Sequence, residues 1–144
     1  MKNQTELATC TCFNLRQAAR AVTQVFDEAL KPAGLRATQF SLLAVLSKIN
    51  SATITQLSQF MVMDRTTLTR NLKPLESLGW VQIVPGEDRR QRTVSLTSKG
   101  QETLAKALPF WKKAQTFAVD RLSPARWQRL IKDLGQTVQA FDPD

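Results

Sequence analysis

Leucines recur at spacings of four, three and three residues between positions 64 and 79, and arginine and threonine fill positions between them. These leucines are Leu68, Leu72, Leu75 and Leu78. Their spacing predicts a helix with a buried leucine face. The opposite face then carries side chains that suit DNA: Arg65, Thr66, Thr69, Arg70 and Lys73. Arginine can address guanine bidentately, threonine can contact a thymine methyl group or a phosphate oxygen, and lysine neutralises phosphate. On an isolated helix such a face would only be solvated, so its neighbours decide its role.

Three arginines crowd into four residues further along the chain: Arg89, Arg90 and Arg92. Two stretches of alternating polarity, residues 80–84 and 92–96, are expected to be strands joined by a charged hairpin connection. Arg89 and Arg90 lie in the connection, and Arg92 begins the second strand. An arginine at a hairpin tip can enter a narrow minor groove, where the negative potential is enhanced. Alternation along the strand places Arg90 and Arg92 on one side and Arg89 on the other. We therefore expect either Arg89 or Arg90 in the groove.

Side chains suited to catalysis are scarce. The chain has no histidine and no tyrosine, which removes Ser-His-Asp and Cys-His catalysis, imidazole metal ligation and the usual proton shuttle near neutral pH. Neither glycine-rich phosphate motif, GxGxxG or GxxxxGK(S/T), occurs in the sequence. We therefore expect no enzyme, no catalytic residue, no cofactor and no bound metal.

The two cysteines, Cys10 and Cys12, lie one residue apart. They are too close to join distant segments, which argues against a secreted disulfide scaffold. Near the start of a helix they are a candidate thiol sensor of oxidants, electrophiles or soft metals. Helical positions two apart point about 200° away from each other, so the pair would not chelate one ion while helical. The alternatives are two inert small apolar residues or a thiol-dependent enzyme, which lacks an identifiable base.

Length and charge fit a single basic domain. The chain has 144 residues and a formal net charge of +8, a surplus that suits a polyanionic partner. The positive charge is spread along the chain rather than gathered in a tail, so folded elements must present it. The polar first residues and the lack of a long apolar run predict a soluble, cytoplasmic protein without a membrane span.

Apolar periodicity predicts helices on both sides of the arginine-rich segments. The first runs over about residues 5–31, and the next starts near Thr38 as its N-cap. Thr53 with Gln56 has capping-box spacing, and Asp64 is the expected N-cap of the leucine-faced helix, which Pro74 bends.

After the strands, Thr97 or Ser98 caps a helix that Pro109 kinks or interrupts. A last helix opens at residues 123–124 with a serine N-cap and runs to about residue 141.

Helices, a helix-turn-helix and a hairpin describe a winged helix, and the chain resembles the MarR family of bacterial transcription regulators over essentially its whole length. Three stretches carry the resemblance, namely residues 35–43, residues 64–72, and Glu87-Asp88-Arg89-Arg90 followed by Leu96-Thr97-Ser98-Lys99-Gly100. The last is similar to the family's wing motif, D-R-R and then L-T-x-x-G. The expected fold is mainly α with a small β-hairpin wing. The expected single domain, 1–144, comprises dimerisation helices at 1–34 and 101–144 around a DNA-binding lobe at 35–100.

The resemblance implies an obligate homodimer with interlocked terminal helices. Those helices also carry large apolar residues beyond their main stripes, namely Leu7, Phe13, Phe110, Phe117 and Phe141, which demand burial. The alternative is that these residues pack within one chain. By the same resemblance, Asp88 pairs with a neighbouring arginine and orients the wing.

MarR-like proteins are commonly released from DNA by small aromatic or phenolic ligands or by cysteine oxidation. The resemblance implies an effector pocket between the dimerisation helices and the DNA-binding lobe. Candidate lining residues are Phe13, Arg16, Arg20, Phe40, Trp111 and Gln115, whose arginines could bind a carboxylate or phenolate. Ordinary core packing with surface arginines is the alternative.

We therefore expect a homodimeric DNA-binding regulator, more a repressor than an activator, on a pseudo-palindromic operator in double-stranded DNA. A small ligand or thiol modification would release it by favouring one spacing of the two lobes. The alternative from another class is a winged-helix protein–protein adaptor that does not bind specific DNA.

Overall fold

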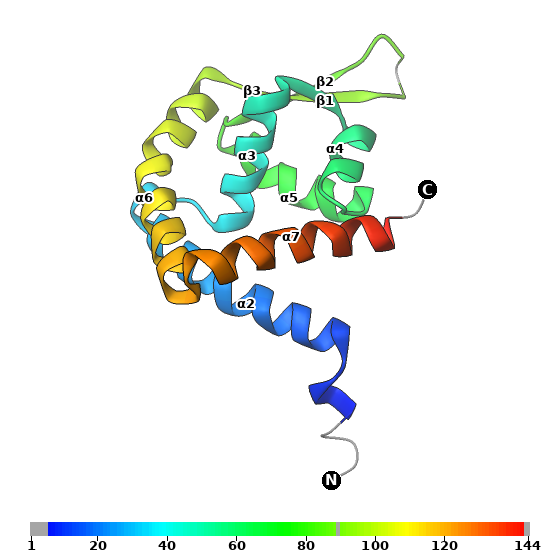
Figure 1. Ribbon diagram of the computed structural model, residues 1–144. Helices are drawn as coiled ribbons and strands as arrows, with labels where there is room; N and C mark the ends of the chain where they lie inside the picture. Colours follow the sequence, from blue (N-terminus) through cyan, green and yellow to red (C-terminus); the bar gives the residue numbers. More distant parts are fainter. Residues whose placement is uncertain (1–5, 89, 143–144) are drawn as a thin grey trace.

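Helices dominate the chain, and three short strands interrupt them in its middle third. The computed structural model describes residues 6–88 and 90–142. The elements follow in the order α2 (Thr11–Leu30), a 3-10 turn (Lys31–Ala33), α3 (Ala37–Ile49), β1 (Ser51–Thr53), α4 (Ile54–Phe60), α5 (Arg65–Ser77), β2 (Val81–Pro85), β3 (Arg92–Leu96), α6 (Ser98–Leu122) and α7 (Pro124–Phe141). Helices from both ends of the chain flank a winged helix-turn-helix lobe, which confirms the predicted fold class (Figure 1).

The sheet has three antiparallel strands in the order β1-β3-β2. The β2–β3 hairpin runs in register from Val81 opposite Leu96 to Pro85 opposite Arg92, close to the predicted strands. The third strand, β1, pairs with the other edge of β3 and was not predicted. Its sequence, Ser-Ala-Thr, is too short to show alternation, and its pairing partner lies about forty residues away in the chain.

The lobe supplies most of the buried core, to which α2 adds Leu30 and α6 adds Ala107. Fully buried side chains come from each of its three helices and from the sheet, among them Leu43, Leu46, Leu57, Leu68, Leu72, Leu75 and Val94. Three of the four predicted leucines of α5 are therefore buried. Leu78 is the exception, with 43% of its surface exposed. It follows the last helical residue as the C-cap, so the helical spacing no longer fixes its direction.

The wing motif Leu96-Thr97-Ser98-Lys99-Gly100 ties the hairpin to α6. Thr97 is the N-cap, which settles the predicted choice between it and Ser98. Its hydroxyl oxygen accepts a hydrogen bond from the Gly100 N–H at 3.0 Å and donates one to the Gly79 carbonyl at 2.5 Å. Gly100 lies so close to the Trp80 carbonyl that a Cβ there would collide with it. The motif therefore requires a glycine because helix and strand backbones meet.

Two predicted caps are confirmed with their hydrogen bonds, one is wrong, and one holds in its position but not in its hydrogen bond. Thr53 and Gln56 form the capping box of α4, and Asp64 caps α5. The start of α3, however, is not Thr38. The helix begins at Ala37, whose N–H donates to the carboxylate of Asp27 on α2 at 2.7 Å. Ser123 stands at the N-cap of α7, directly before Pro124, as predicted, but it has a φ of 69° and its side chain makes no capping bond.

The structure breaks one predicted helix and leaves the two proline-containing helices unbroken. The expected first helix over residues 5–31 is broken at Cys10, whose extended backbone (ψ 114°) separates a short helical segment from α2. Pro109 does not interrupt α6, and Pro74 lies inside an uninterrupted α5. The described part of the chain contains no helix that is both long and apolar enough to cross a membrane.

The helices outside the lobe bury little of their apolar surface. α2 packs against α6, and α6 in turn contacts α3 and α7. Leu30 is the single buried residue of α2, and none of α7 is buried. Figure 1 shows α2 extending away from the lobe and α7 crossing beneath it.

Candidate nucleic-acid interface

The exposed face of α5 presents the predicted DNA-contacting side chains. Leu68, Leu72 and Leu75 anchor the helix in the lobe core. The five predicted residues Arg65, Thr66, Thr69, Arg70 and Lys73 are all exposed. Because the buried leucines fix the rotation of the helix, this polar face has a defined direction.

The N-terminus of α5 is stabilised by a charged cap. A carboxylate oxygen of Asp64 accepts the Thr67 backbone N–H at 2.8 Å, and the other accepts the Thr67 hydroxyl at 2.6 Å. These bonds to Thr67, the side-chain one first, lower the pKa of Asp64 below its ordinary value of 3.8. The carboxylate thus stays ionised and fixes the backbone immediately before Arg65.

A network of backbone hydrogen bonds shapes the wing tip. The Gly86 N–H donates to the Gln91 carbonyl at 2.5 Å, and the Gln91 N–H donates to the Asp88 carbonyl at 2.8 Å. The carboxylate of Asp88 accepts the backbone N–H of Arg90 at 3.1 Å. Asp88 was expected to pair with a neighbouring arginine and to orient the wing. Its contact within the described residues is to the backbone of Arg90, and its role in orienting the wing stays a prediction. Arg89 lies outside the described residues.

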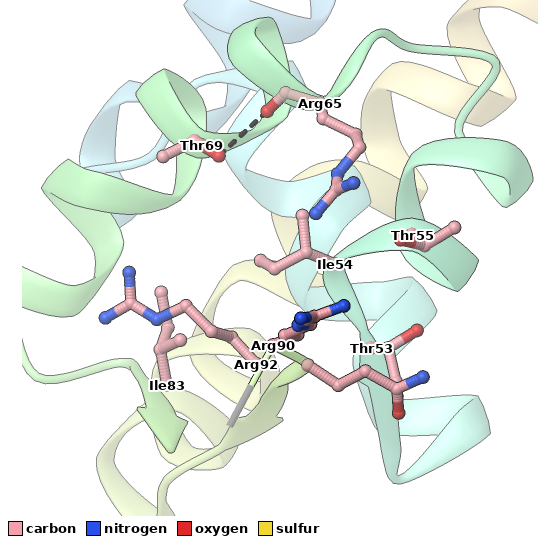
Figure 2. A pocket seen from close by; sticks show the side chains of 9 residues that line it. Thr53, Ile54, Thr55, Arg65, Thr69, Ile83, Arg90 and Arg92 are labelled. Atoms are coloured by element: carbon pink, nitrogen blue, oxygen red, sulfur yellow. Dashed lines mark hydrogen bonds between the residues drawn. The ribbon is translucent and has the colours of Figure 1, made fainter. Parts of the chain in front are cut away.

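A hollow of about 140 Å³ lies between the start of α5, the start of α4 and the wing. Figure 2 shows its lining residues, which are Thr53, Ile54, Thr55, Arg65, Thr69, Ile83, Arg90, Gln91 and Arg92. The structure thus brings together four predicted site residues from two separate segments, Arg65 and Thr69 with Arg90 and Arg92. Arg90 and Arg92 both line the hollow, but Gln91 between them does so too, so the predicted common side of the two arginines stays a prediction. Thr66, Arg70 and Lys73 lie on α5 but do not line it.

Sequence reasoning missed three polar lining residues. Thr53 was recognised only as a helix cap, Thr55 was assigned no role, and Gln91 was assigned to the hairpin connection. Their place follows from strand β1, which pairs with β3 and carries the start of α4 to the wing. A capping box directly before a helix-turn-helix was the available signal, but it does not indicate which face the threonines occupy.

Of the six candidate effector residues, the structure shows two, Phe40 and Trp111, in contact with each other. The rings of Phe40 and Trp111 stack with centroids 5.7 Å apart and planes 12° from parallel, which joins α3 to α6. Phe13, Arg16 and Arg20 lie on the exposed part of α2, and Gln115 is half-buried on α6. A pocket containing all six residues remains a prediction.

Both thiols are free. Cys10 is half-buried at the N-cap of α2, and Cys12 is exposed in its first turn. Cys10 has an extended backbone, so the condition under which the pair would not chelate one ion, both residues being helical, is not met. Among the described residues, no group of three or more His, Cys, Asp or Glu side chains could hold a metal ion.

Comparisons with known proteins agree with this architecture. Residues 35–91 match the model of the MarR family. The uncharacterised HTH-type transcriptional regulator YwoH of Bacillus subtilis (strain 168) is 35% identical over 88 residues, 61% of this chain and 64% of YwoH. The transcriptional activatory protein BadR of Rhodopseudomonas palustris is 32% identical over 100 residues, 67% of this chain and 57% of BadR. The chain therefore spans less than two thirds of either curated relative.

Solved structures extend the similarity to nearly the whole chain. The transcriptional regulator MosR of M. tuberculosis, crystallised with DNA, is 41% identical, with a TM-score of 0.79 over 91% of this chain and 97% of MosR. A MarR variant from E. coli in complex with operator DNA shares the fold, with a TM-score of 0.78 at 23% identity over 86% of this chain and 90% of that one. The buried leucines under an exposed basic face, the wing with its L-T-x-x-G motif and these matches together show that the chain belongs to the MarR family of transcriptional regulators.

Proposed function

We propose that the protein is a homodimeric repressor that binds a pseudo-palindromic operator through α5 and the wing. The convergence of Arg65 and Thr69 of α5 with Arg90 and Arg92 of the wing on one hollow carries the proposal. A DNA duplex bound to the exposed face of α5 would also contact the wing arginines. α5 then lies in the major groove, and either Arg89 or Arg90 enters the adjacent minor groove.

Dimerisation is supported by the apolar surface that one chain leaves exposed. Leu130, Ile131, Leu134 and Val138 form one stripe along α7, and all four are exposed. A second stripe on α2 and α6 includes Val22, Val25 and Phe117. Such surface is rare on a monomer. A two-fold dimer would cover it and set two recognition helices about one DNA turn apart.

Repression follows from occupancy of the operator, which excludes other proteins from the same DNA. Binding to chromosomal DNA also makes the cytoplasm the proposed location. We further propose two signals that release the protein from DNA. A small aromatic ligand joining the Phe40–Trp111 stack would contact α3 and α6 together, and modification of Cys10 or Cys12 would act at the start of α2. Either signal would work by favouring a lobe spacing that does not fit the operator.

The test is a titration of the purified protein against a library of short duplexes at several salt concentrations, with complex mass measured. We expect a dimer that selects an inverted repeat. Replacing both Arg89 and Arg90 by alanine should weaken binding roughly tenfold or more and flatten the salt dependence, since each lost phosphate contact lowers the slope by about one. Arg126→Ala on α7, which is also exposed, is the matched control. Weak, sequence-blind binding would instead favour the adaptor.

A further inference from the structure

The lining of the hollow between α5 and the wing is positively charged. Arg65, Arg90 and Arg92 are its three charged residues, and no carboxylate is among the nine that line it. The carboxylates next to it in the chain are engaged elsewhere: Asp64 accepts two hydrogen bonds from Thr67, and Asp88 accepts the Arg90 backbone N–H. The single ion pair shown by the described residues, Lys31 with Glu28, is on α2 and the turn after it. The residues that line the hollow therefore supply no counter-charge of their own, and an anionic ligand would provide one.

The polar groups around the hollow favour a ligand that only accepts hydrogen bonds. A guanidinium donates and cannot accept. The Thr53 hydroxyl oxygen accepts the Gln56 N–H at 3.1 Å, which leaves its own proton for another acceptor. The Thr69 hydroxyl donates to the Arg65 carbonyl at 2.8 Å, so it contributes least. The Thr55 hydroxyl makes no hydrogen bond within the described residues. Two threonine donors and three arginines match the oxygens of a phosphate group.

The volume of the hollow and its apolar lining residues further restrict the class of ligand that it can bind. Ile54 and Ile83 contribute apolar surface to a space of about 140 Å³. Figure 2 shows Ile54 between Arg65 on one side and the wing arginines on the other. A nucleic-acid backbone presents both kinds of surface, because the carbon edge of each sugar adjoins a charged phosphate. Other base-reading candidates, such as Arg70 and Lys73, lie outside this enclosure.

We infer that the hollow is a phosphate site that takes one phosphate group of the DNA backbone and also accepts free inorganic phosphate. The inference rests on the proposed mode of DNA binding and adds Thr53 and Thr55 to the binding residues. Its lining comes from three segments that meet only in the folded lobe. A bound phosphate therefore neutralises the mutual repulsion of the arginines and fixes the wing relative to α5. Free phosphate occupies the same hollow and competes with DNA.

The first arm of the test uses no DNA. Inorganic phosphate is titrated into the ¹⁵N-labelled protein at constant ionic strength, with chloride as the reference anion. We expect saturable amide shifts confined to the starts of α4 and α5 and to the wing, in the wild type and in Arg70→Ala. Arg65→Ala should weaken the apparent phosphate affinity about tenfold, because one of three charge-assisted donors is lost. Equal responses to chloride and phosphate, or equal affinities in the two variants, would overturn the inference.

The second arm identifies the DNA phosphate. Each backbone phosphate of a selected duplex is replaced in turn by a neutral methylphosphonate. At one position per half-site, the methylphosphonate should weaken binding by the wild type roughly tenfold. At the same position it should weaken binding by Arg65→Ala less than about twofold. Arg70→Ala should bind the duplex more weakly overall yet keep the full dependence at that position. If phosphate saturates the hollow but no duplex is bound specifically, the proposed function fails. If specific binding persists without a position coupled to Arg65, the DNA-phosphate assignment fails.

Discussion

The DNA-binding lobe and the terminal helices bury their apolar residues to very different extents. In the lobe, α3, α4, α5 and the sheet surround leucines that have no solvent exposure. In α7, a stripe of comparable apolar content has no buried member. Both regions show clear helical periodicity in the sequence, so periodicity identifies the apolar face of a helix but not what covers it. The lobe finds its cover within the chain, whereas the apolar stripe of α7 is left uncovered by it.

Charging the α7 stripe should have the largest effect. Ile131 and Val138 are 50% and 48% exposed in one chain, so replacing both by glutamate leaves the lobe intact. In the proposed dimer the two carboxylates would be buried without partners, which costs several kcal/mol in all. We expect at least a hundredfold weaker dimerisation, and loss of operator binding with it, by sedimentation and by duplex titration. Gln136→Glu on the opposite side of α7 is the control. An unchanged mass would remove the stripe from the dimer interface.

A core substitution in the lobe should sharpen the contrast. Leu72 is fully buried, and Leu134 is exposed on α7. Leu72→Ala should lower the free energy of unfolding by about 3 kcal/mol, because it removes buried methyl groups and leaves a cavity. For this variant, the loss should be similar at every protein concentration in denaturant titrations. The loss caused by Leu134→Ala should shrink as dilution favours the monomer, in which this side chain is already exposed. Equal losses without any concentration dependence would contradict the division into a self-covered and a partner-covered region.

Local interactions explain what the sequence predicted well. The capping box of Thr53 and Gln56 and the Asp64 cap join residues three apart, so pattern and structure share the same few residues. Strand β1 was missed because its pairing with β3 joins distant parts of the chain. That pairing also brings Thr53 and Thr55 to the wing arginines. The individual candidates of the DNA interface were therefore readable from spacing, while their convergence on one hollow was not.

The same limit applies at the junction between the two regions. Asp27 of α2 supplies the acceptor for the first N–H of α3, at 2.7 Å across a separation of ten residues. Sequence reasoning placed the cap at Thr38 because it sought a side chain adjacent to the helix, and a neighbouring helix provides one instead. This hydrogen bond links α2 to the first residue of α3.

Breaking this junction should have the smallest effect. Asp27→Ala leaves the Ala37 N–H without its acceptor and should cost about 1 kcal/mol of unfolding free energy, as the loss of a helix cap does. Asp27→Asn keeps an acceptor oxygen and should retain most of that stability. Hydrogen exchange of the Ala37 amide is the decisive readout, since it should accelerate in the alanine variant and stay slow in the asparagine variant. Equal protection in both variants would show that α2 and the lobe are held together by the packing of α2 and α3 against α6, and that the Asp27 bond only accompanies it.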